Sequence, residues 1–100
     1  MAVYVDNLRI PWRGKEWCHL LADSLDELHS FAETLGLKRA WFQSKASYPH
    51  YDITTQTREV ALRMGARRGT RQQIIYCARK LKEEQKGSAP NSIQLALFDK

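Results

Sequence analysis

Hydrophobic and polar positions alternate along part of the chain and recur at helical spacing along other parts. Residues 2–7, AVYVDN, alternate small apolar and β-favouring residues, which predicts an opening strand. Residues 10–17, IPWRGKEW, hold Pro11 and Gly14 among aromatic and basic side chains, a composition typical of a loop. Residues 18–23, CHLLAD, form a short apolar run that fits either a buried strand or a turn into the next element.

The clearest helix prediction covers residues 24–37, SLDELHSFAETLGL. Ser24 forms a capping box with Glu27 three residues later, and Gly36 stands where a helix commonly stops. One face of this helix carries its apolar side chains, which are Leu25, Leu28, Phe31, Ala32 and Leu35. The RAWFQ segment at residues 39–43 then predicts a second strand, with the helix as the crossover from the first half of the chain.

A loop is predicted over residues 44–54, SKASYPHYDIT, and a second helix after it. Thr54 or Thr55 caps this helix, and Gly65 ends it. Its apolar stripe consists of Val60, Ala61 and Met64.

The third predicted helix starts at Thr70, where Gln73 completes another capping box. Its buried side chains are expected to be Ile74, Ile75, Ala78 and Leu81. Residues 86–92, KGSAPNS, have the composition of a linker. The pattern predicts a small α/β domain over residues 1–86, with a short, mostly parallel sheet and about three helices. A flexible tail over residues 87–100 follows it.

Composition limits the class of protein further. One hundred residues suit one domain, and a hydrophobic fraction of 43% argues against wholesale disorder. No apolar run approaches the length of a transmembrane helix, and the N-terminus lacks the layout of a secretory signal. Cys18 and Cys77 have no metal-binding spacing. We therefore expect two reduced core thiols, a cytoplasmic location and no membrane partner.

The positive charge is concentrated in one segment. Residues 1–57 hold six basic against seven acidic residues, a net charge of −1, whereas residues 58–86 hold nine against three, a net charge of +6. Such a segment can attract the phosphates of a nucleic acid, although a solvated helical face has the same composition. The candidate nucleic-acid-binding residues are Arg67, Arg68, Arg71, Arg79 and Lys80.

Residues that can do chemistry gather in the N-terminal half. Asp6 lies at the carboxyl end of the first predicted strand, where open α/β sheets place their ligand sites. With His19, His50 and Asp52 it could hold a divalent cation or act in acid–base catalysis.

Each of these residues also has a structural interpretation. His19 fits a satisfied core imidazole, and Asp52 fits the cap of a turn. Asp23 fits a carboxylate beside a helix N-terminus. His29 falls on the polar side of its helix, where we expect it to have no role. The chain has no HxxxH pair, glycine-rich phosphate loop or serine elbow.

Five separated sequence blocks precede a helix with the sequence REVALRMGA. The blocks are VYVDN, PWRGKEWCHLLAD, SLDELHSFAETLGL, RAWFQ and PHYDIT. In this order they resemble a family of small bacterial and phage proteins that is catalogued as a domain of unknown function. The resemblance covers roughly residues 2–66 and implies no activity. The residues that match the family's pattern are Asp6, Trp12, Cys18, His19, Asp23, Arg39, Trp41, Gln43, His50, Tyr51 and Asp52.

The C-terminal tail carries a second resemblance. Its QLALF segment, residues 94–98, is similar to the peptide by which bacterial replication and repair proteins dock on the β sliding clamp. In such a peptide Gln94 would bond at the rim of the pocket. The apolar anchors would be Leu95, Leu97 and Phe98. The alternative is an edge strand that folds back onto its own domain.

Two functions follow as hypotheses. The first is a non-catalytic adaptor or modulator of DNA replication or repair, tethered to the clamp by its tail and touching nucleic acid with its basic segment. It needs no cofactor. The alternative is a small metal-dependent nuclease or phosphoesterase that uses a divalent metal. Its candidate catalytic and metal-binding residues are Asp6, His19, His50 and Asp52.

Overall fold

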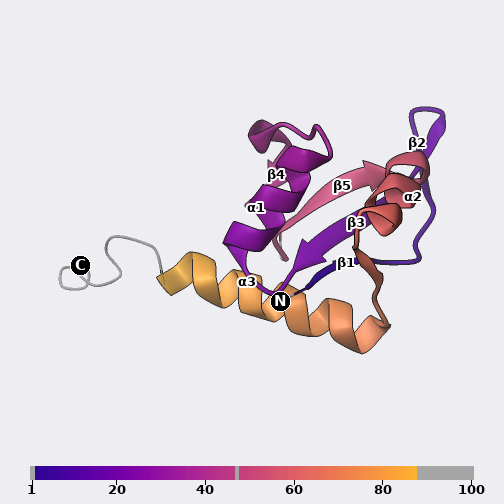
Figure 1. The fold of residues 1–100 in the computed structure, drawn as a ribbon. Helices are drawn as coiled ribbons and strands as arrows, with labels where there is room; N and C mark the ends of the chain where they lie inside the picture. The colour runs from indigo at the N-terminus through magenta and orange to yellow at the C-terminus, as the bar shows by residue number, and fades with distance from the viewer. Residues whose placement is uncertain (1, 47, 88–100) are drawn as a thin grey trace.

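A computed structural model describes residues 2–46 and 48–87 as one small mixed α/β domain built on a central sheet (Figure 1). The strands are β1 (Val3–Val5), β2 (Ile10–Trp12), β3 (Lys15–Ala22), β4 (Phe42–Gln43), β5 (His50–Thr54) and β6 (Arg67–Arg68). The helices are α1 (Leu25–Thr34), η1 (Arg39–Trp41, a 3-10 helix), α2 (Thr55–Arg63) and α3 (Arg71–Gly87). Figure 1 shows α1 and α2 on one side of the sheet and α3 on the other.

The sheet is mostly antiparallel, so the prediction of a mostly parallel sheet is wrong. The strand order is β4-β5-β3-β1-β6, with β2 paired to β3 beside this path. Only the β1–β6 pair is parallel among the described strands. The physical reason is that α1 does not cross over to a parallel strand. It leads instead into η1 and the short strand β4, which runs antiparallel to β5.

Residues 10–17 form a β-hairpin rather than the predicted loop. Strands β2 and β3 are joined by Arg13 and Gly14, whose φ angles are 52° and 76°. Two central residues with positive φ are what a type I′ turn requires, and this turn matches the twist of the flanking strands. Pro11 is accommodated because β2 pairs only with β3 among the described strands.

Residues 50–54 form the strand β5, although a loop was predicted for them. Tyr51 and Ile53 are buried on one face of β5, whereas His50, Asp52 and Thr54 point to the other face. The alternation is therefore regular. Such alternation is typical of a half-buried strand, so the loop prediction overlooked a signal that the sequence contains.

The predicted helix starts are confirmed by their side-chain caps. Ser24 Oγ accepts a hydrogen bond from the N–H of Glu27 at 3.2 Å. Thr54 Oγ1 accepts the N–H of Thr57 at 3.1 Å. The pair of Thr70 and Gln73 is reciprocal, since each side chain accepts the other's backbone N–H. The predicted C-terminal ends of α1 and α2 are also confirmed. Gly36 follows α1 and Gly65 follows α2, with positive φ angles of 83° and 112°.

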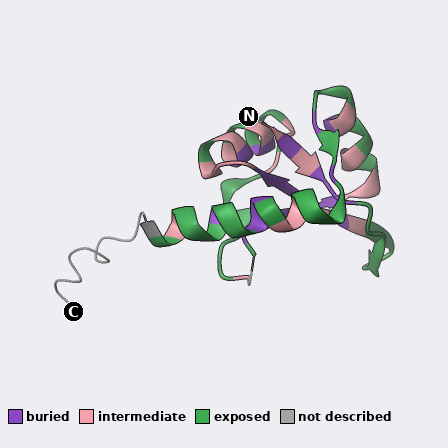
Figure 2. Cartoon of the chain, turned by 90° about the horizontal axis from the view of Figure 1, so that it is seen from below, coloured by how far each residue is buried: buried purple, intermediate pink, exposed green. Residues whose placement is uncertain are grey.

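The main core lies between the sheet and the helices α1 and α2. Its side chains include Val5, Leu20, Leu28, Tyr51, Ile53 and Ala61. The middle of α3 buries Cys77, Ala78 and Leu81 while most of its surface is exposed (Figure 2). The predicted stripe of α2 is partly wrong, because Val60 and Met64 are 39% and 45% exposed. Of the predicted α3 core residues, Ile74 and Ile75 are only half-buried.

Cys18 and Cys77 are both buried free thiols, as the sequence predicted. No helix in residues 2–46 and 48–87 has the length and apolar character needed to cross a membrane. Of the predicted tail, residues 88–100 lie outside the described residues, and Gly87 ends α3. The clamp-binding prediction for Gln94 to Phe98 therefore has no structural account.

Candidate metal centre

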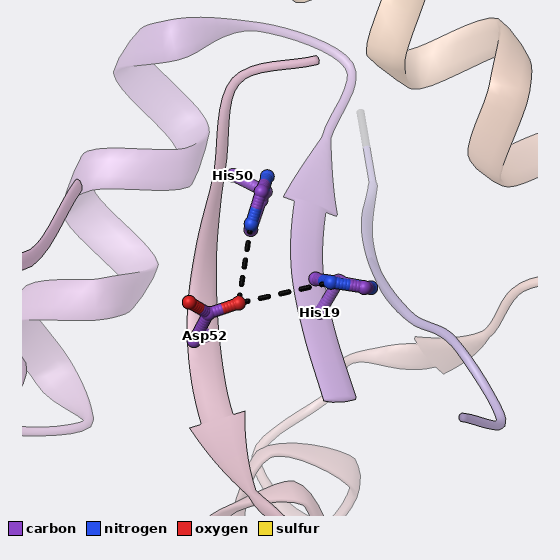
Figure 3. Close-up of side chains that lie close together, drawn as sticks. All are labelled: His19, His50 and Asp52. Carbon is purple, nitrogen blue, oxygen red and sulfur yellow. Dashed lines mark hydrogen bonds and ion pairs between the residues drawn. The ribbon is translucent and has the colours of Figure 1, made fainter. Parts of the chain in front are cut away.

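Two histidines and an aspartate meet on one face of the sheet. His19 on β3 and Asp52 on β5 are directly opposite each other in the antiparallel pair. His50 precedes Asp52 by two residues, so both side chains leave β5 on the same face. One nitrogen of each imidazole and one carboxylate oxygen all lie within 4.8 Å of one another (Figure 3). The sheet register therefore brings together three of the four predicted residues as potential ligands.

The inner side of the cluster is defined by the Nε2 atoms of the two imidazoles. His50 Nε2 lies 3.1 Å from Asp52 Oδ1, and His19 Nε2 lies 3.7 Å from the same oxygen (Figure 3). The side chains of His19 and His50 are 26% and 17% exposed, whereas that of Asp52 is 43% exposed. The carboxylate therefore forms the solvent-facing side of the cluster.

The other nitrogen of each imidazole is bound to an oxygen outside the cluster. His19 Nδ1 lies 2.6 Å from Asp6 Oδ2, and His50 Nδ1 lies 2.7 Å from the backbone carbonyl of Tyr48. Carbonyl and carboxylate oxygens accept hydrogen bonds, so Nδ1 is the donor in both rings. In the neutral imidazole each Nε2 then presents a lone pair.

Three hydrogen-bond acceptors consequently face one another. The lone pairs of two Nε2 atoms and the carboxylate of Asp52 repel unless a positive charge lies among them. That charge is either a proton on an imidazole or a metal ion. Metal-binding histidines in proteins almost always donate their second N–H to a carboxylate or a backbone carbonyl, and both kinds of partner occur here.

Asp6 is the fourth predicted residue, and it supports His19 rather than joining the ligand cluster. It follows β1 directly and is only 8% exposed. Its carboxylate also accepts the backbone N–H of His19 at 3.0 Å and of Leu8 at 3.4 Å. The Arg58 side chain on α2 donates to the backbone carbonyl of Asp6 at 2.9 Å and to Asn7 Oδ1 at 2.6 Å. The loop after β1 is thereby fixed against the sheet.

The electrostatics of the Asp6–His19 pair favour an ionised carboxylate and a basic imidazole. Burial alone would raise the pKa of Asp6, but the hydrogen bonds from the side chain and backbone of His19 lower it below its ordinary value. The hydrogen bond to Asp6 raises the pKa of His19, although burial opposes this. A more basic imidazole is also a stronger metal ligand.

Asp52 also borders a cavity of about 720 Å³ at the open side of β5. All three tryptophans of the chain, Trp12, Trp17 and Trp41, line this cavity. The candidate metal centre is thus adjacent to an aromatic groove. Sequence analysis did not find this groove, because the hairpin and η1 that shape it were not predicted.

The predicted basic residues lie elsewhere. Arg67 and Arg68 are on β6, at the opposite edge of the sheet from β4. Arg71, Arg79 and Lys80 are exposed along α3. The structure therefore separates the predicted phosphate-binding segment from the histidine–aspartate cluster.

Two further expectations, for His29 and Asp52, are corrected. His29 has a structural role, since its Nδ1 lies 2.8 Å from the hydroxyl of Tyr51 and its ring packs against Phe42. Asp23 directly precedes the N-cap Ser24 of α1, and it also accepts the N–H of Ala2 at 3.0 Å and the thiol of Cys77 at 3.5 Å, so it ties the start of the chain to α3. Asp52 belongs to a strand and does not cap a turn.

The sequence signals for the supporting contacts were weak. In the sequence Arg58 is one charge of the basic segment, and nothing in the local sequence indicates that it reaches the loop after β1. The Tyr48 carbonyl is a backbone group, which no sequence pattern identifies. Gln94, Leu95, Leu97 and Phe98 lie outside the described residues.

Comparison with known proteins agrees with the sequence blocks. A search of curated proteins and a search of solved structures found no match to the chain. A family model matches residues 3–81, which extends the resemblance from the opening strand into the middle of α3. The chain therefore belongs to the family described as Protein of unknown function (DUF4031).

Proposed function

We propose that the protein is a small metal-dependent hydrolase of phosphoester bonds, with one divalent cation held by His19, His50 and Asp52. The observation that carries the proposal is the orientation of the two imidazoles. Both place Nδ1 against an oxygen outside the cluster and turn Nε2 toward the same carboxylate. A cation is the partner that satisfies all three groups at once.

Two of the three separations suit a first-row metal ion, and the third, between the two imidazole nitrogens, is within 4.8 Å. Ligands about 2.1 Å from a tetrahedral zinc ion are about 3.4 Å apart. The separations of 3.1 and 3.7 Å between Asp52 Oδ1 and the two Nε2 atoms lie on either side of that value. Three protein ligands leave a fourth position for water, as in catalytic zinc sites. Two imidazoles and a carboxylate also suit manganese, iron and nickel.

The proposed chemistry follows from the ligand set and the charge. When bound, the cation supplies a water molecule whose pKa is lowered to about 7. Hydrolysis adds the hydroxyl of that water to phosphorus, breaks the P–O bond and gives the proton to the leaving alcohol. The exposed side of the cluster, at Asp52, is where a substrate can approach. The formal net charge of +5 attracts anionic substrates such as phosphoesters to the protein as a whole, although the excess of basic residues lies in residues 58–86 and not at the cluster.

Asp6 acts as a positioning residue in this proposal. Its hydrogen bond at 2.6 Å fixes the tautomer and the plane of the His19 ring. The Tyr48 carbonyl does the same for His50. Neither group needs to touch the substrate.

The clamp-binding tail supports a second, compatible role. The QLALF segment at residues 94–98 agrees with the docking pattern at every specified position. Docking on the β sliding clamp would hold the domain at DNA and raise its effective concentration there. The adaptor hypothesis and the hydrolase proposal therefore share this tether. The convergence of His19, His50 and Asp52 favours the hydrolase over an adaptor without catalysis.

Metal analysis after dialysis against zinc or manganese tests the proposal directly. We expect about one equivalent of metal in the wild-type protein and loss of that metal in His50→Gln. His29→Gln is the matched control, because His29 is the third histidine and lies outside the cluster. The same samples should hydrolyse bis(p-nitrophenyl) phosphate only when the metal is present. Equal metal content in the two variants would contradict the site, and metal binding without hydrolysis would contradict the reaction.

A further inference from the structure

We infer that the groove beside the metal centre binds single-stranded nucleic acid, whose bases stack on the tryptophans. The claim that this nucleic acid is the substrate rests on the proposed function. The claim that the groove binds it rests only on the residues that line the groove. Its walls come from the β2–β3 hairpin, from η1 and from β5, and they include Trp12, Trp17, Trp41 and Asp52.

The tryptophans are placed on the surface and not in the core. Trp12 is 57% exposed and Trp41 is 49% exposed, although each could bury a large apolar area. All three tryptophans of a 100-residue chain border one cavity. Large apolar side chains gathered at one exposed site mark a binding surface, whereas single exposed ones are ordinary.

The aromatic surface is held in place before a ligand arrives. Trp17 donates its indole N–H to the carbonyl of Trp12 at 2.9 Å. The two rings meet edge to face, with their centroids 5.8 Å apart. The type I′ turn at Arg13 and Gly14 fixes the hairpin that carries them. Little ordering of these side chains is therefore needed on binding.

Cations border the same rings. The guanidinium carbon of Arg13 lies 4.7 Å from the centroid of the Trp12 ring, and Lys38 Nζ lies 5.7 Å from that of Trp41. Proteins that bind single strands combine aromatic stacking surfaces with positive charge along the backbone path. Arg9, by contrast, is paired with Glu16 on the same hairpin at 3.0 Å. Arg13 and Lys38 are thus the cations placed to meet phosphates between stacked bases.

The position of Asp52 connects this surface to the proposed chemistry. Asp52 is both a candidate ligand and part of the cavity wall. A strand whose bases stack on the tryptophans would therefore pass its phosphodiester backbone beside the cation. A cavity of about 720 Å³ is within the usual range for ligand sites.

Other occupants fit the groove less well. Duplex DNA hides the faces of its bases, so it cannot stack on exposed rings. A peptide added to the free edge of β5 would use backbone hydrogen bonds and would have no need of the flanking cations. A sugar would stack on the rings but carries no phosphate for Arg13 and Lys38. Each of these becomes an outcome of the test below.

Fluorescence anisotropy with a labelled oligo-dT of about ten nucleotides tests the inference. The holoprotein at low salt should bind it more tightly than an abasic strand of equal length or the duplex. Trp41→Ala should weaken binding about 5- to 150-fold, with Trp41→Phe retaining part of the affinity. Tyr76→Ala is the matched control, since Tyr76 is 58% exposed with Lys80 5.6 Å from its ring, but it lies on α3. We expect no change in that variant.

Several results would overturn the inference. These are equal affinity for oligo-dT and the abasic strand, tighter binding of duplex, or equal losses in Trp41→Ala and Tyr76→Ala. The affinity of a variant in which Arg67 and Arg68 are neutralised tests the alternative binding surface, because these residues lie on β6, at the opposite edge of the sheet from β4. If that pair and not Trp41 determines affinity, the basic segment is the binding surface and the groove is not.

Failure of the two proposals can be told apart. His50→Gln should still bind oligo-dT, because the stacking residues are intact, but should not cleave it. If the wild-type protein binds the oligonucleotide without metal-dependent cleavage, the hydrolase proposal fails alone. If it hydrolyses bis(p-nitrophenyl) phosphate but does not bind the oligonucleotide, the groove assignment fails alone.

Discussion

Asp6 and Asp52 both contact His19, yet replacing each by asparagine should have different consequences for the stability of the fold. Asp6 is 8% exposed and accepts three N–H groups, at 2.6, 3.0 and 3.4 Å. The side chain of Asp52 is 43% exposed and contacts only the two imidazoles among the described residues. We therefore expect Asp6→Asn to act on stability first and Asp52→Asn to act on metal binding first.

The expected loss of stability in Asp6→Asn follows from the hydrogen bond that is lost. The asparagine oxygen can keep the backbone N–H bonds, but its NH₂ group would oppose the donor at His19 Nδ1. Loss of a hydrogen bond to a charged group costs about 1.5–3 kcal/mol. In a domain of this size that corresponds to a fall in Tm of about 6–24 °C. Metal affinity should also fall about 10- to 100-fold, because His19 is no longer oriented.

Asp52→Asn removes a ligand at an exposed position. Its ion pairs with His19 and His50 are partly solvated, so the free energy of unfolding should change by less than about 1 kcal/mol. Metal binding should be lost, and with it the rise in Tm that a bound ion produces in the wild type.

Urea unfolding followed by circular dichroism, in chelator and then in zinc, measures both quantities on the same samples. Calorimetric titration gives the metal affinity separately. The reasoning is wrong if Asp6→Asn is as stable as the wild type in chelator. It is also wrong if Asp52→Asn keeps the wild-type zinc affinity, because the third ligand would then be misassigned.

Three other predictions concern the rest of the chain. Burial lowers the pKa of His29 below its ordinary value of 6.5, so the unfolded state binds more protons and stability is lost as the pH falls through and below that value. The pKa of His19 shifts in the opposite direction, so the pH dependence of the wild type alone mixes the two histidines. Measuring the unfolding free energy of the wild type and of His29→Gln from about pH 5 to pH 8, and subtracting one from the other, isolates the effect of His29. Burial raises the pKa values of Cys18 and Cys77 to about 12, so a thiol reagent should modify neither until denaturant is added, and rapid modification of the native protein would contradict this. Truncation after Ser92 should change stability by only a few tenths of a kcal/mol, and Leu97→Ala with Phe98→Ala should abolish capture of the sliding clamp from bacterial lysate; a stability loss of several kcal/mol would indicate a tail packed on its own domain.

Local sequence signals predicted the helices well because the residues that start and end each helix lie within a few positions of its ends. Ser24, Thr54 and Thr70 cap their helices through contacts three residues away. Such contacts need no tertiary context. The sheet was predicted poorly for the opposite reason. Whether a strand pattern after a helix pairs parallel or antiparallel depends on partners far along the chain, as in the pairing of His19 with Asp52.

The candidate site was predicted by residue type but not by arrangement. Asp6, His19, His50 and Asp52 were all selected from the sequence, and Figure 3 shows three of them converging. The sequence could not show which of the four residues are candidate metal ligands and which one orients a ligand. That distinction depends on burial and on the direction of each imidazole, which are set by the β3–β5 register.

The polar face of β5 links the failed strand prediction to the site. His50, Asp52 and Thr54 alternate with the buried Tyr51 and Ile53 as in a half-buried strand, so the signal was present in the sequence although a loop was predicted. The same face stays open at Asp52, whose side chain is 43% exposed, because α3 packs farther along the sheet, where Tyr4 and Asp23 lie beside the residues of its first half. β4 pairs with β5 only at Tyr51 and His50 among the described residues, so the rest of β5 stays open toward the tryptophans. A short neighbouring strand and an offset helix thus give the metal centre its access, and the regular alternation of β5 places His50 and Asp52 on that open face.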